Sequence, residues 1–186
     1  MSLARSGVFL DRDGVVNRAE VRDGKPLPPA RVEDFELLDG AAEAVQQARR
    51  AGFAVVVVTN QPDVARGDQR REVVEAMNDI VREALQPDAI MVCFHDETDG
   101  CDCRKPAPGM LLAAAADLEL DLSGSFMVGD RWRDIEAGRR AGCRTVLVDR
   151  GYAERRAEDP DAIVADLGEA VTWILGTLVE KEARDG

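Results

Sequence analysis

The sequence is poor in histidine, lysine and aromatic residues, and these shortages limit the chemistry open to it. Of its 186 residues one is a histidine, and aromatic residues make up 4%. A mechanism that needs two histidines is therefore excluded. None of the four cysteines is followed by an arginine six positions later, which excludes a nucleophilic cysteine of the C-x₅-R type. The absence of a glycine-rich P-loop argues against a kinase.

Long apolar runs are also absent. No stretch is long enough to span a bilayer or to form the core of a secretion signal, so we expect a cytoplasmic protein. The formal net charge of −12 argues against nucleic acid or an anionic membrane as a partner, while a small anionic ligand stays possible in a locally basic pocket. The length predicts one domain, residues 1–186, and the acidic surface leads us to expect a monomer.

Predicted strands and helices alternate along the chain, which is typical of an α/β protein with three layers and a doubly wound, mainly parallel sheet. The prolines near residues 26–29 predict an exposed irregular loop. Asp68 is the predicted N-cap of the second helix. The expected strands are residues 7–10, 54–58, 89–93, 125–128 and 144–148, with a short edge strand at 163–164. The expected helices are residues 40–51, 68–85, 109–120, 132–141 and 167–181.

Two carboxylates, Asp11 and Asp13, follow directly after the first predicted strand. Residues two apart on a strand point the same way, so both side chains are expected to face one space. Two acids held this close repel unless a metal ion or a shared proton lies between them. A helix cap or an Asx turn explains the pair equally well when it is taken alone.

Other polar residues stand at the ends of neighbouring predicted strands. Thr59, Asn60 and Gln61 follow the second strand, and Gly129-Asp130 follows the fourth. Ligands of such sheets bind beyond the carboxyl ends of the strands, where these side chains converge with Asp11 and Asp13. Carboxylate oxygens suit Mg²⁺, and Lys105 with a threonine suits the oxygens of a phosphate. A carboxylate can itself attack phosphorus.

Cysteine and the single histidine are concentrated in one short segment. Cys93, His95, Cys101 and Cys103 lie within eleven positions, in a C-x-H…C-x-C pattern. Three thiolates and one imidazole make a closed tetrahedral zinc site, which is structural rather than catalytic. We therefore predict a structural Zn²⁺ that closes the loop, in preference to free thiols or a redox pair. Cys143 is expected to be a small core residue.

These motifs, in this order, resemble the haloacid dehalogenase superfamily of phosphatases over nearly the whole chain. The resemblance implies that Asp11 is the nucleophile and Asp13 the acid and base. It also implies that Thr59 and Lys105 hold the phosphoryl oxygens. Mg²⁺ is then expected on the Asp11 carboxylate, the Asp13 backbone carbonyl and the Asp130 carboxylate. Asp134 is expected to act from outside the metal's own ligands, or to favour the start of a helix through the helix dipole.

Within that superfamily, the zinc loop followed by Cys103-Arg104-Lys105-Pro106 is similar to the heptose-bisphosphate phosphatases, which carry a minimal cap. That resemblance implies a small phosphorylated sugar as substrate, most specifically the 7-phosphate of a heptose 1,7-bisphosphate. The substrate-binding residues it implies are Asn60, Gln61, Arg104 and Arg131.

Several differences from the usual sequence of this family leave other substrates possible. The family usually has serine where this chain has Pro62, His-Gly-Tyr where it has Arg18–Val21, and Cys-Pro-His where it has Cys-Phe-His. Histidinol-phosphate phosphatases have a similar zinc loop and are the main alternative, together with other small phosphate monoesters. A non-enzymatic ligand-binding member is less favoured because all the catalytic motifs are present. A phosphoryl-transferring mutase is less favoured because no insertion is long enough for a large cap.

Overall fold

A six-stranded sheet forms the centre of the computed structural model, which describes residues 5–185. The strand order is β5-β4-β1-β6-β7-β8, and all five neighbouring pairs are parallel. The strands are β1 (Arg5–Leu10), β4 (Ala54–Asn60), β5 (Ala89–Cys93), β6 (Leu120–Gly129), β7 (Arg144–Val148) and β8 (Ala162–Val164). The predicted α/β fold with a mainly parallel, doubly wound sheet is confirmed.

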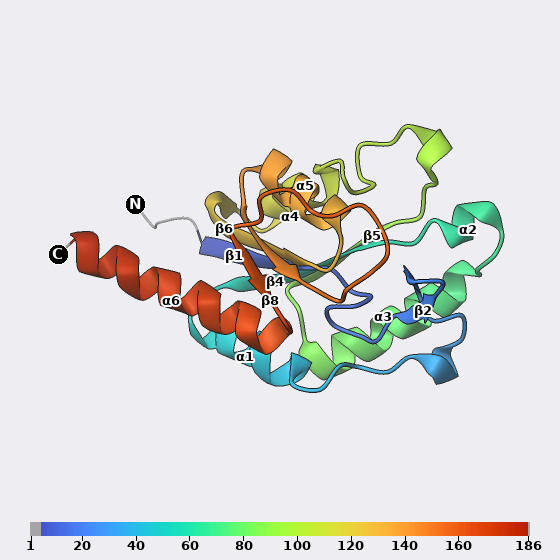
Figure 1. The fold of residues 1–186 in the computed structure, drawn as a ribbon, viewed down its shortest axis with the longest axis horizontal. Helices are drawn as coiled ribbons and strands as arrows, with labels where there is room; N and C mark the ends of the chain where they lie inside the picture. Colours follow the sequence, from blue (N-terminus) through green and yellow to red (C-terminus); the bar gives the residue numbers. More distant parts are fainter. Residues whose placement is uncertain (1–4, 186) are drawn as a thin grey trace.

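Helices cover both faces of this sheet, as Figure 1 shows. One face packs against α1 (Ala41–Arg50), α3 (Arg71–Leu85) and α6 (Leu167–Asp185), and the other packs against α4 (Gly109–Asp117) and α5 (Trp132–Ala141). Successive residues of β4 alternate between the two cores: Val55 and Val57 face the first set of helices, and Val56 and Val58 face the second. A strand buried on both faces reads as a continuous apolar run for this reason.

The predicted boundaries of β5, β7 and α5 agree with the structure, and those of the other elements differ from it. The helix expected over 109–120 ends at Asp117, because Glu119 has a positive φ of 53° that a right-handed helix does not tolerate. The strand expected over 125–128 instead begins at Leu120, which pairs with Arg5 of β1.

The helix expected over 68–85 begins later than predicted, at Arg71, and a separate short helix that was not predicted precedes it. A short helix α2 (Asp63–Arg66) ends at Gly67, whose φ is 78°, and α3 begins only at Arg71. Asp68 lies between the two helices and is not a cap, since the N-cap of α3 is Arg70 and makes no side-chain cap bond. An additional short 3₁₀ helix, η1, spans Val32–Asp34.

The proline-rich segment is more ordered than predicted. It contains a two-stranded antiparallel hairpin of β2 (Glu20–Arg22) and β3 (Lys25–Leu27). The turn between them is Asp23-Gly24, with φ values of 51° and 73°, as a tight two-residue hairpin turn requires. Pro26 is buried and anchors the hairpin. The prediction of an irregular loop was therefore wrong for residues 20–27.

The hairpin, α2 and the segment after β5 all lie at the carboxyl end of the sheet, at the right of Figure 1. The strand order reverses between β1 and β6, because the chain runs from β1 to β4 and β5 on one side and to β7 and β8 on the other. Open parallel sheets bind ligands at such a reversal. Within residues 5–185, no helix combines the length and apolar character needed to cross a bilayer.

Candidate active site and metal sites

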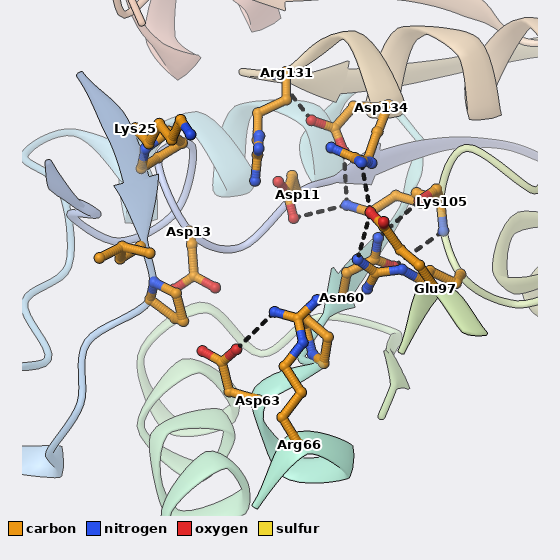
Figure 2. A pocket seen from close by; sticks show the side chains of 16 residues that line it. Asp11, Asp13, Lys25, Asn60, Asp63, Arg66, Glu97, Lys105, Arg131 and Asp134 are labelled. Atoms are coloured by element: carbon orange, nitrogen blue, oxygen red, sulfur yellow. Dashed lines mark hydrogen bonds and ion pairs between the residues drawn. The ribbon is translucent and has the colours of Figure 1, made fainter. Parts of the chain in front are cut away.

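A buried ion-pair cluster lies where β1 and β6 end. The Lys105 ammonium donates to the Asp11 carboxylate at 2.8 Å and contacts the Asp134 carboxylate at 2.7 Å. It also donates to the Val58 carbonyl oxygen at the end of β4, at 2.7 Å. The Lys105 side chain is 2% exposed, so this charge lies among strand ends rather than in solvent. Figure 2 shows the lysine between the two aspartates.

The carboxylates outnumber the ammonium in this cluster, and their pKa values reflect it. Burial, with repulsion from Asp134, raises the pKa of Asp11 to about 7. Burial, with repulsion from Asp11 and Asp134, also raises the pKa of Asp130 well above its usual range. Burial opposes the charge of Lys105, but Asp11 and Asp134 outweigh this effect and raise the pKa of the lysine. The cluster therefore has more negative charge than Lys105 alone can balance.

Asp130 has the environment of a metal ligand. Both of its carboxylate oxygens are buried and have no hydrogen-bond partner among the described residues. A Cβ atom on Gly14 would lie 1.8 Å from Asp130 Oδ2. The Asp130 carboxylate therefore fits against the turn after β1 only because residue 14 is a glycine and has no side chain. Oxygen atoms of Asp11, Asp130 and Asp134 lie within 4.8 Å of one another. This donor set fits a hard divalent cation such as Mg²⁺.

Asp13 is held by a ring of donors. Both of its carboxylate oxygens accept from Arg12 at 3.1 Å, and the amides of Asn17 and Gln61 donate to it at 3.0 and 2.7 Å. Gln61 also donates to Thr59 Oγ1 at 2.9 Å. Arg12, Asn17, Gln61 and Thr59 are all buried, so these bonds fix the direction in which Asp13 points.

The four predicted zinc ligands come together at the end of β5. The thiols of Cys93, Cys101 and Cys103 and the imidazole of His95 contact one another at 3.1 to 3.8 Å. Ligand atoms about 2.3 Å from a tetrahedral zinc lie about 3.8 Å apart, so this donor set fits Zn²⁺ with small adjustments.

The thiols of this cluster differ in their surroundings. Burial, together with a hydrogen bond to Cys103, raises the pKa of Cys93 to about 12. At Cys101 burial acts in the same direction, but hydrogen bonds from the Arg104 backbone and the neighbouring thiols outweigh it and lower the pKa to about 7. A zinc ion would stabilise all three thiolates, since a metal-bound cysteine is deprotonated.

The cysteine–histidine loop (residues 93–103) leads directly into Lys105. Lys105 follows Cys103 by two residues. Two hydrogen bonds to the side chain of Asn60 fix the Lys105 backbone to the end of β4. Lys105 N donates to Asn60 Oδ1 at 3.0 Å, and Asn60 Nδ2 donates to the Lys105 carbonyl oxygen at 2.9 Å. Inside the loop, Asp96 and Asp99 cap the short 3₁₀ helix η2 (Glu97–Asp99).

A cavity of about 430 Å³ opens above Asp11 and Asp13. Six cationic side chains line it, as Figure 2 shows for several of them: Lys25, Arg66, Arg104, Lys105, Arg131 and Arg133. Arg131 pairs with Glu154 at 2.5 Å, while Arg104 and Arg133 share Glu97 at 3.5 and 2.7 Å. Five carboxylates line the cavity as well, so its lining has one more cation than acid, whereas the whole protein has a net charge of −12. Such a cavity suits an anionic ligand.

Comparisons with known proteins agree with this geometry. The profile of a family described as HAD-hydrolase-like matches residues 102–170. The chain is 40% identical to a D-glycero-D-manno-heptose-1,7-bisphosphate 7-phosphatase of Chlorobaculum tepidum, over 91% of this chain and 94% of that protein. It is 34% identical to the D-glycero-beta-D-manno-heptose-1,7-bisphosphate 7-phosphatase of Escherichia coli K12, over 97% and 93%. The chain belongs to this family of HAD phosphatases.

Solved structures of the family have the same fold. A D,D-heptose 1,7-bisphosphate phosphatase from B. bronchiseptica, in complex with magnesium and phosphate, superposes with a TM-score of 0.80. It is 33% identical, and the match covers 92% of this chain and 99% of that one. A HAD-like phosphatase from Mesorhizobium loti gives 0.74 at 33% identity, over 92% and 86%. The superfamily predicted from the sequence motifs is confirmed.

The residues expected to bind substrate in this HAD phosphatase fall into two groups, those that line the cavity and one that does not. Asn60, Arg104 and Arg131 line the cavity. Gln61 is buried and faces Asp13 and Thr59 instead. Its place in the site is therefore beneath the cavity, as a support for Asp13.

The structure adds to the prediction at two cavity residues: Asp134 was expected to act from outside the metal's own ligands, and Lys25 was not assigned to the site. Asp134 contacts Lys105, and its other oxygen accepts from the Arg131 backbone N–H at 3.0 Å. Its position in the first turn of α5 was visible in the sequence, but its contact with Lys105 was not. Lys25 lines the cavity from the hairpin, and the only signal for it was the rarity of lysine in the chain.

Proposed function

We propose that this protein is a Mg²⁺-dependent phosphatase that removes the 7-phosphate of D-glycero-D-manno-heptose 1,7-bisphosphate. The observation that carries the proposal is the buried Asp11–Lys105–Asp134 cluster, which lines the cavity. Asp130, whose buried oxygens have no hydrogen-bond partner among the described residues, lies beside this cluster. The relatives named for this activity cover nearly the whole chain. The six cationic side chains of the cavity are groups that can bind the phosphates of a bisphosphate.

The side chains of Asp11 and Asp130 and the backbone carbonyl of Asp13 would hold Mg²⁺, with Asp134 at its side. When bound, Mg²⁺ neutralises charge on the phosphoryl oxygens and on the carboxylates around it. Lys105 supplies a further positive charge, and its three contacts hold it in place before substrate arrives. Thr59, at the end of β4, is the proposed hydroxyl contact for the phosphoryl group.

Hydrolysis proceeds in two steps on this chain's own residues. In the first step an Asp11 oxygen bonds to phosphorus, the ester P–O bond breaks, and Asp13 gives its proton to the departing sugar oxygen. In the second step Asp13 takes a proton from water, and the water oxygen bonds to phosphorus. The bond between phosphorus and Asp11 breaks, which releases inorganic phosphate and restores the Asp11 carboxylate. Arg12, Asn17 and Gln61 keep Asp13 aimed at the reacting oxygen throughout.

Zn²⁺ on Cys93, His95, Cys101 and Cys103 would be structural in this scheme. All four ligand positions are filled by protein atoms, which leaves no position for water or substrate. Its contribution is to hold the backbone that leads into Arg104 and Lys105.

A phosphate-release panel tests the activity. It contains both anomers of heptose 1,7-bisphosphate, fructose 1,6-bisphosphate and histidinol phosphate, and phosphorus NMR identifies which phosphate leaves. We expect the highest kcat/KM for a heptose bisphosphate, with loss of the 7-phosphate. A higher kcat/KM for histidinol phosphate would contradict the proposed substrate while preserving the chemistry of Asp11.

We also infer that the enzyme acts as a monomer in the cytoplasm, as one domain over residues 1–186, without nucleic acid or membrane partners. The formal net charge of −12 supports the last point, because it repels polyanions. Light scattering of the purified protein tests the monomer, and a species of twice the mass at micromolar concentration would contradict it.

A further inference from the structure

The β2–β3 hairpin is built to hold one lysine at the mouth of the cavity. Lys25 is the first residue of β3, and it pairs with Arg22 across the two-residue turn. It lies among the residues that line the cavity, together with the next three residues of the hairpin and the segment after it. A tight turn and a paired strand restrict the backbone of Lys25 far more than an irregular loop would.

The tip of the hairpin is also docked against the segment after β7. Ala153 N donates to the Gly24 carbonyl oxygen at 2.8 Å. A Cβ atom on Gly24 would lie 2.6 Å from the Ala153 Cβ, so the close contact needs glycine at this position. The residue after Ala153 is Glu154, which holds the Arg131 guanidinium through an ion pair. One contact therefore positions the hairpin next to the segment that orients Arg131.

Charge pairing separates Lys25 from every other cation in the cavity. Arg66, Arg104, Lys105, Arg131 and Arg133 each form an ion pair with a carboxylate. The five acidic residues that line the cavity are engaged in the same way: Asp11, Asp13, Asp63, Glu97 and Asp134. Within residues 5–185, Lys25 has no carboxylate within ion-pair distance, so its charge is available to a ligand.

The choice of residue type is consistent with this role. The sequence has three lysines against twenty-one arginines, and two of the three, Lys25 and Lys105, line this cavity. An ammonium on a four-carbon stem is a mobile point charge that can follow a phosphate group. Lys105 is buried at the bottom beside Asp11, whereas Lys25 is exposed at the rim (Figure 2).

We propose that Lys25 is a specificity residue that binds the phosphate group which is not hydrolysed. The proposal rests on the proposed function, because it requires a substrate with two phosphates. Lys105 and Asp11 take the phosphate at the floor of the cavity, and Lys25 takes the second at its rim. A substrate with one phosphate has no group for Lys25 to bind.

The test compares Lys25→Met, which keeps the length of the side chain and removes its charge, with wild type on two substrates. For heptose 1,7-bisphosphate we expect KM to rise by about tenfold, with kcat within about twofold of wild type. For p-nitrophenyl phosphate, which has one phosphate, kcat/KM should stay unchanged. Lys25→Arg should restore most of the affinity for the bisphosphate.

Arg22→Met is the matched control, because Arg22 stands on the same hairpin, pairs with Glu20 at 2.7 Å and does not line the cavity. It should leave both substrates unaffected. Equal losses on both substrates in Lys25→Met, or no loss on either, would overturn the role of Lys25.

A second measurement separates this proposal from the identity of the sugar. Fructose 1,6-bisphosphate and glucose 6-phosphate are compared as inhibitors of p-nitrophenyl phosphate hydrolysis. Lys25→Met should weaken inhibition by the bisphosphate and leave inhibition by the monophosphate unchanged. If wild type fails to hydrolyse heptose bisphosphate, the proposed substrate is wrong, and this inhibition comparison still decides the role of Lys25. Equal inhibition constants in wild type and variant would overturn it.

Discussion

The aspartate cluster (Asp11, Asp130 and Asp134 around Lys105) and the cysteine–histidine loop both gather charged or metal-binding side chains, but different forces hold them together. The aspartates are buried at the ends of β1 and β6 and at the start of α5, and the core beneath them fixes their positions. In the loop, Cys93 is buried at the end of β5, whereas residues 97–100 are exposed and bury no apolar side chain.

Because of this difference, the two regions should depend on their metal ions to different degrees for their structure. The packing of the sheet brings the buried carboxylates of the aspartate cluster together although they repel one another. A bound cation would reduce this repulsion, but the fold of the sheet does not require it. Apart from its four candidate ligands, the loop is held mainly by partly exposed ion pairs such as Arg66–Asp96 and Arg133–Glu97, which contribute little stability. We therefore expect zinc binding and loop folding to be coupled. Lys105 belongs to both regions, because it follows the loop in sequence and pairs with the aspartates in space.

The largest expected effect comes from removing the nucleophile from the aspartate cluster. Asp11→Asn should lower kcat by at least about a thousandfold, because an amide cannot form the phosphoryl intermediate. The melting temperature should stay the same or rise, since burial disfavours the Asp11 charge. Phosphate release and circular dichroism measure the two quantities. Asp39→Asn, at an exposed position, is the control. Residual activity of several per cent would refute the assignment of Asp11.

The next effect concerns the positioning of Lys105. Asp134→Asn removes one of the two carboxylates that hold the ammonium and should lower kcat by about a hundredfold, which corresponds to about 2.7 kcal/mol. Zinc content should stay at wild-type level, because Asp134 lies outside the loop. A variant with wild-type kcat would show that Asp11 and Val58 alone position the lysine.

A smaller loss of activity is expected when the loop loses its metal. Cys101→Ser should reduce the zinc content below one ion per chain and lower activity by about tenfold, because residues 93–105 lose order while the sheet remains folded. Metal analysis gives the zinc content, and hydrogen exchange locates the loss of order. Cys143→Ser is the matched control, since Cys143 is buried and burial raises its pKa to about 12. Wild-type zinc content in Cys101→Ser would refute the ligand set.

The smallest effect is the pH dependence of the magnesium site. Burial raises the pKa of Asp11 from 3.8 to about 7 in the metal-free protein, so below pH 7 Mg²⁺ must displace a proton. Its Kd should fall by up to about tenfold per pH unit as pH rises toward 7, and level off above it. Titration calorimetry between pH 5.5 and 8.5 measures this. A Kd that does not change with pH would contradict it.

The same shift predicts the stability of the metal-free protein. A carboxyl whose pKa is raised in the folded state contributes stability below its unfolded value of 3.8, and this contribution is lost as pH rises through about 7. The melting temperature without Mg²⁺ should therefore decrease across this range, and added Mg²⁺ should restore it. In Asp11→Asn this part of the pH dependence should be absent.

Much of this molecule could be predicted from the sequence because the signals are local. The apolar run of β4 predicted a strand buried on both faces, and the two-sided core confirmed it. The spacing of Cys93, His95, Cys101 and Cys103 predicted a cluster, since four donors so close in sequence can meet without help from the rest of the fold. Two of the boundaries that failed have identifiable reasons. Glu119, with its positive φ, ends the helix expected over 109–120 early, and β6 begins at Leu120 because that residue pairs with Arg5 of β1.

The sequence by itself therefore determined the class of fold and the superfamily, and it selected the strand-end residues that are proposed to be catalytic. Only the tertiary structure decided that Asp134 contacts Lys105, that Gln61 supports Asp13 from below, and that the hairpin places Lys25 at the cavity mouth. These contacts join residues far apart in the chain or at the docked tip of a hairpin. Their distances depend on how whole strands and helices pack, and no local pattern in the sequence specifies that packing.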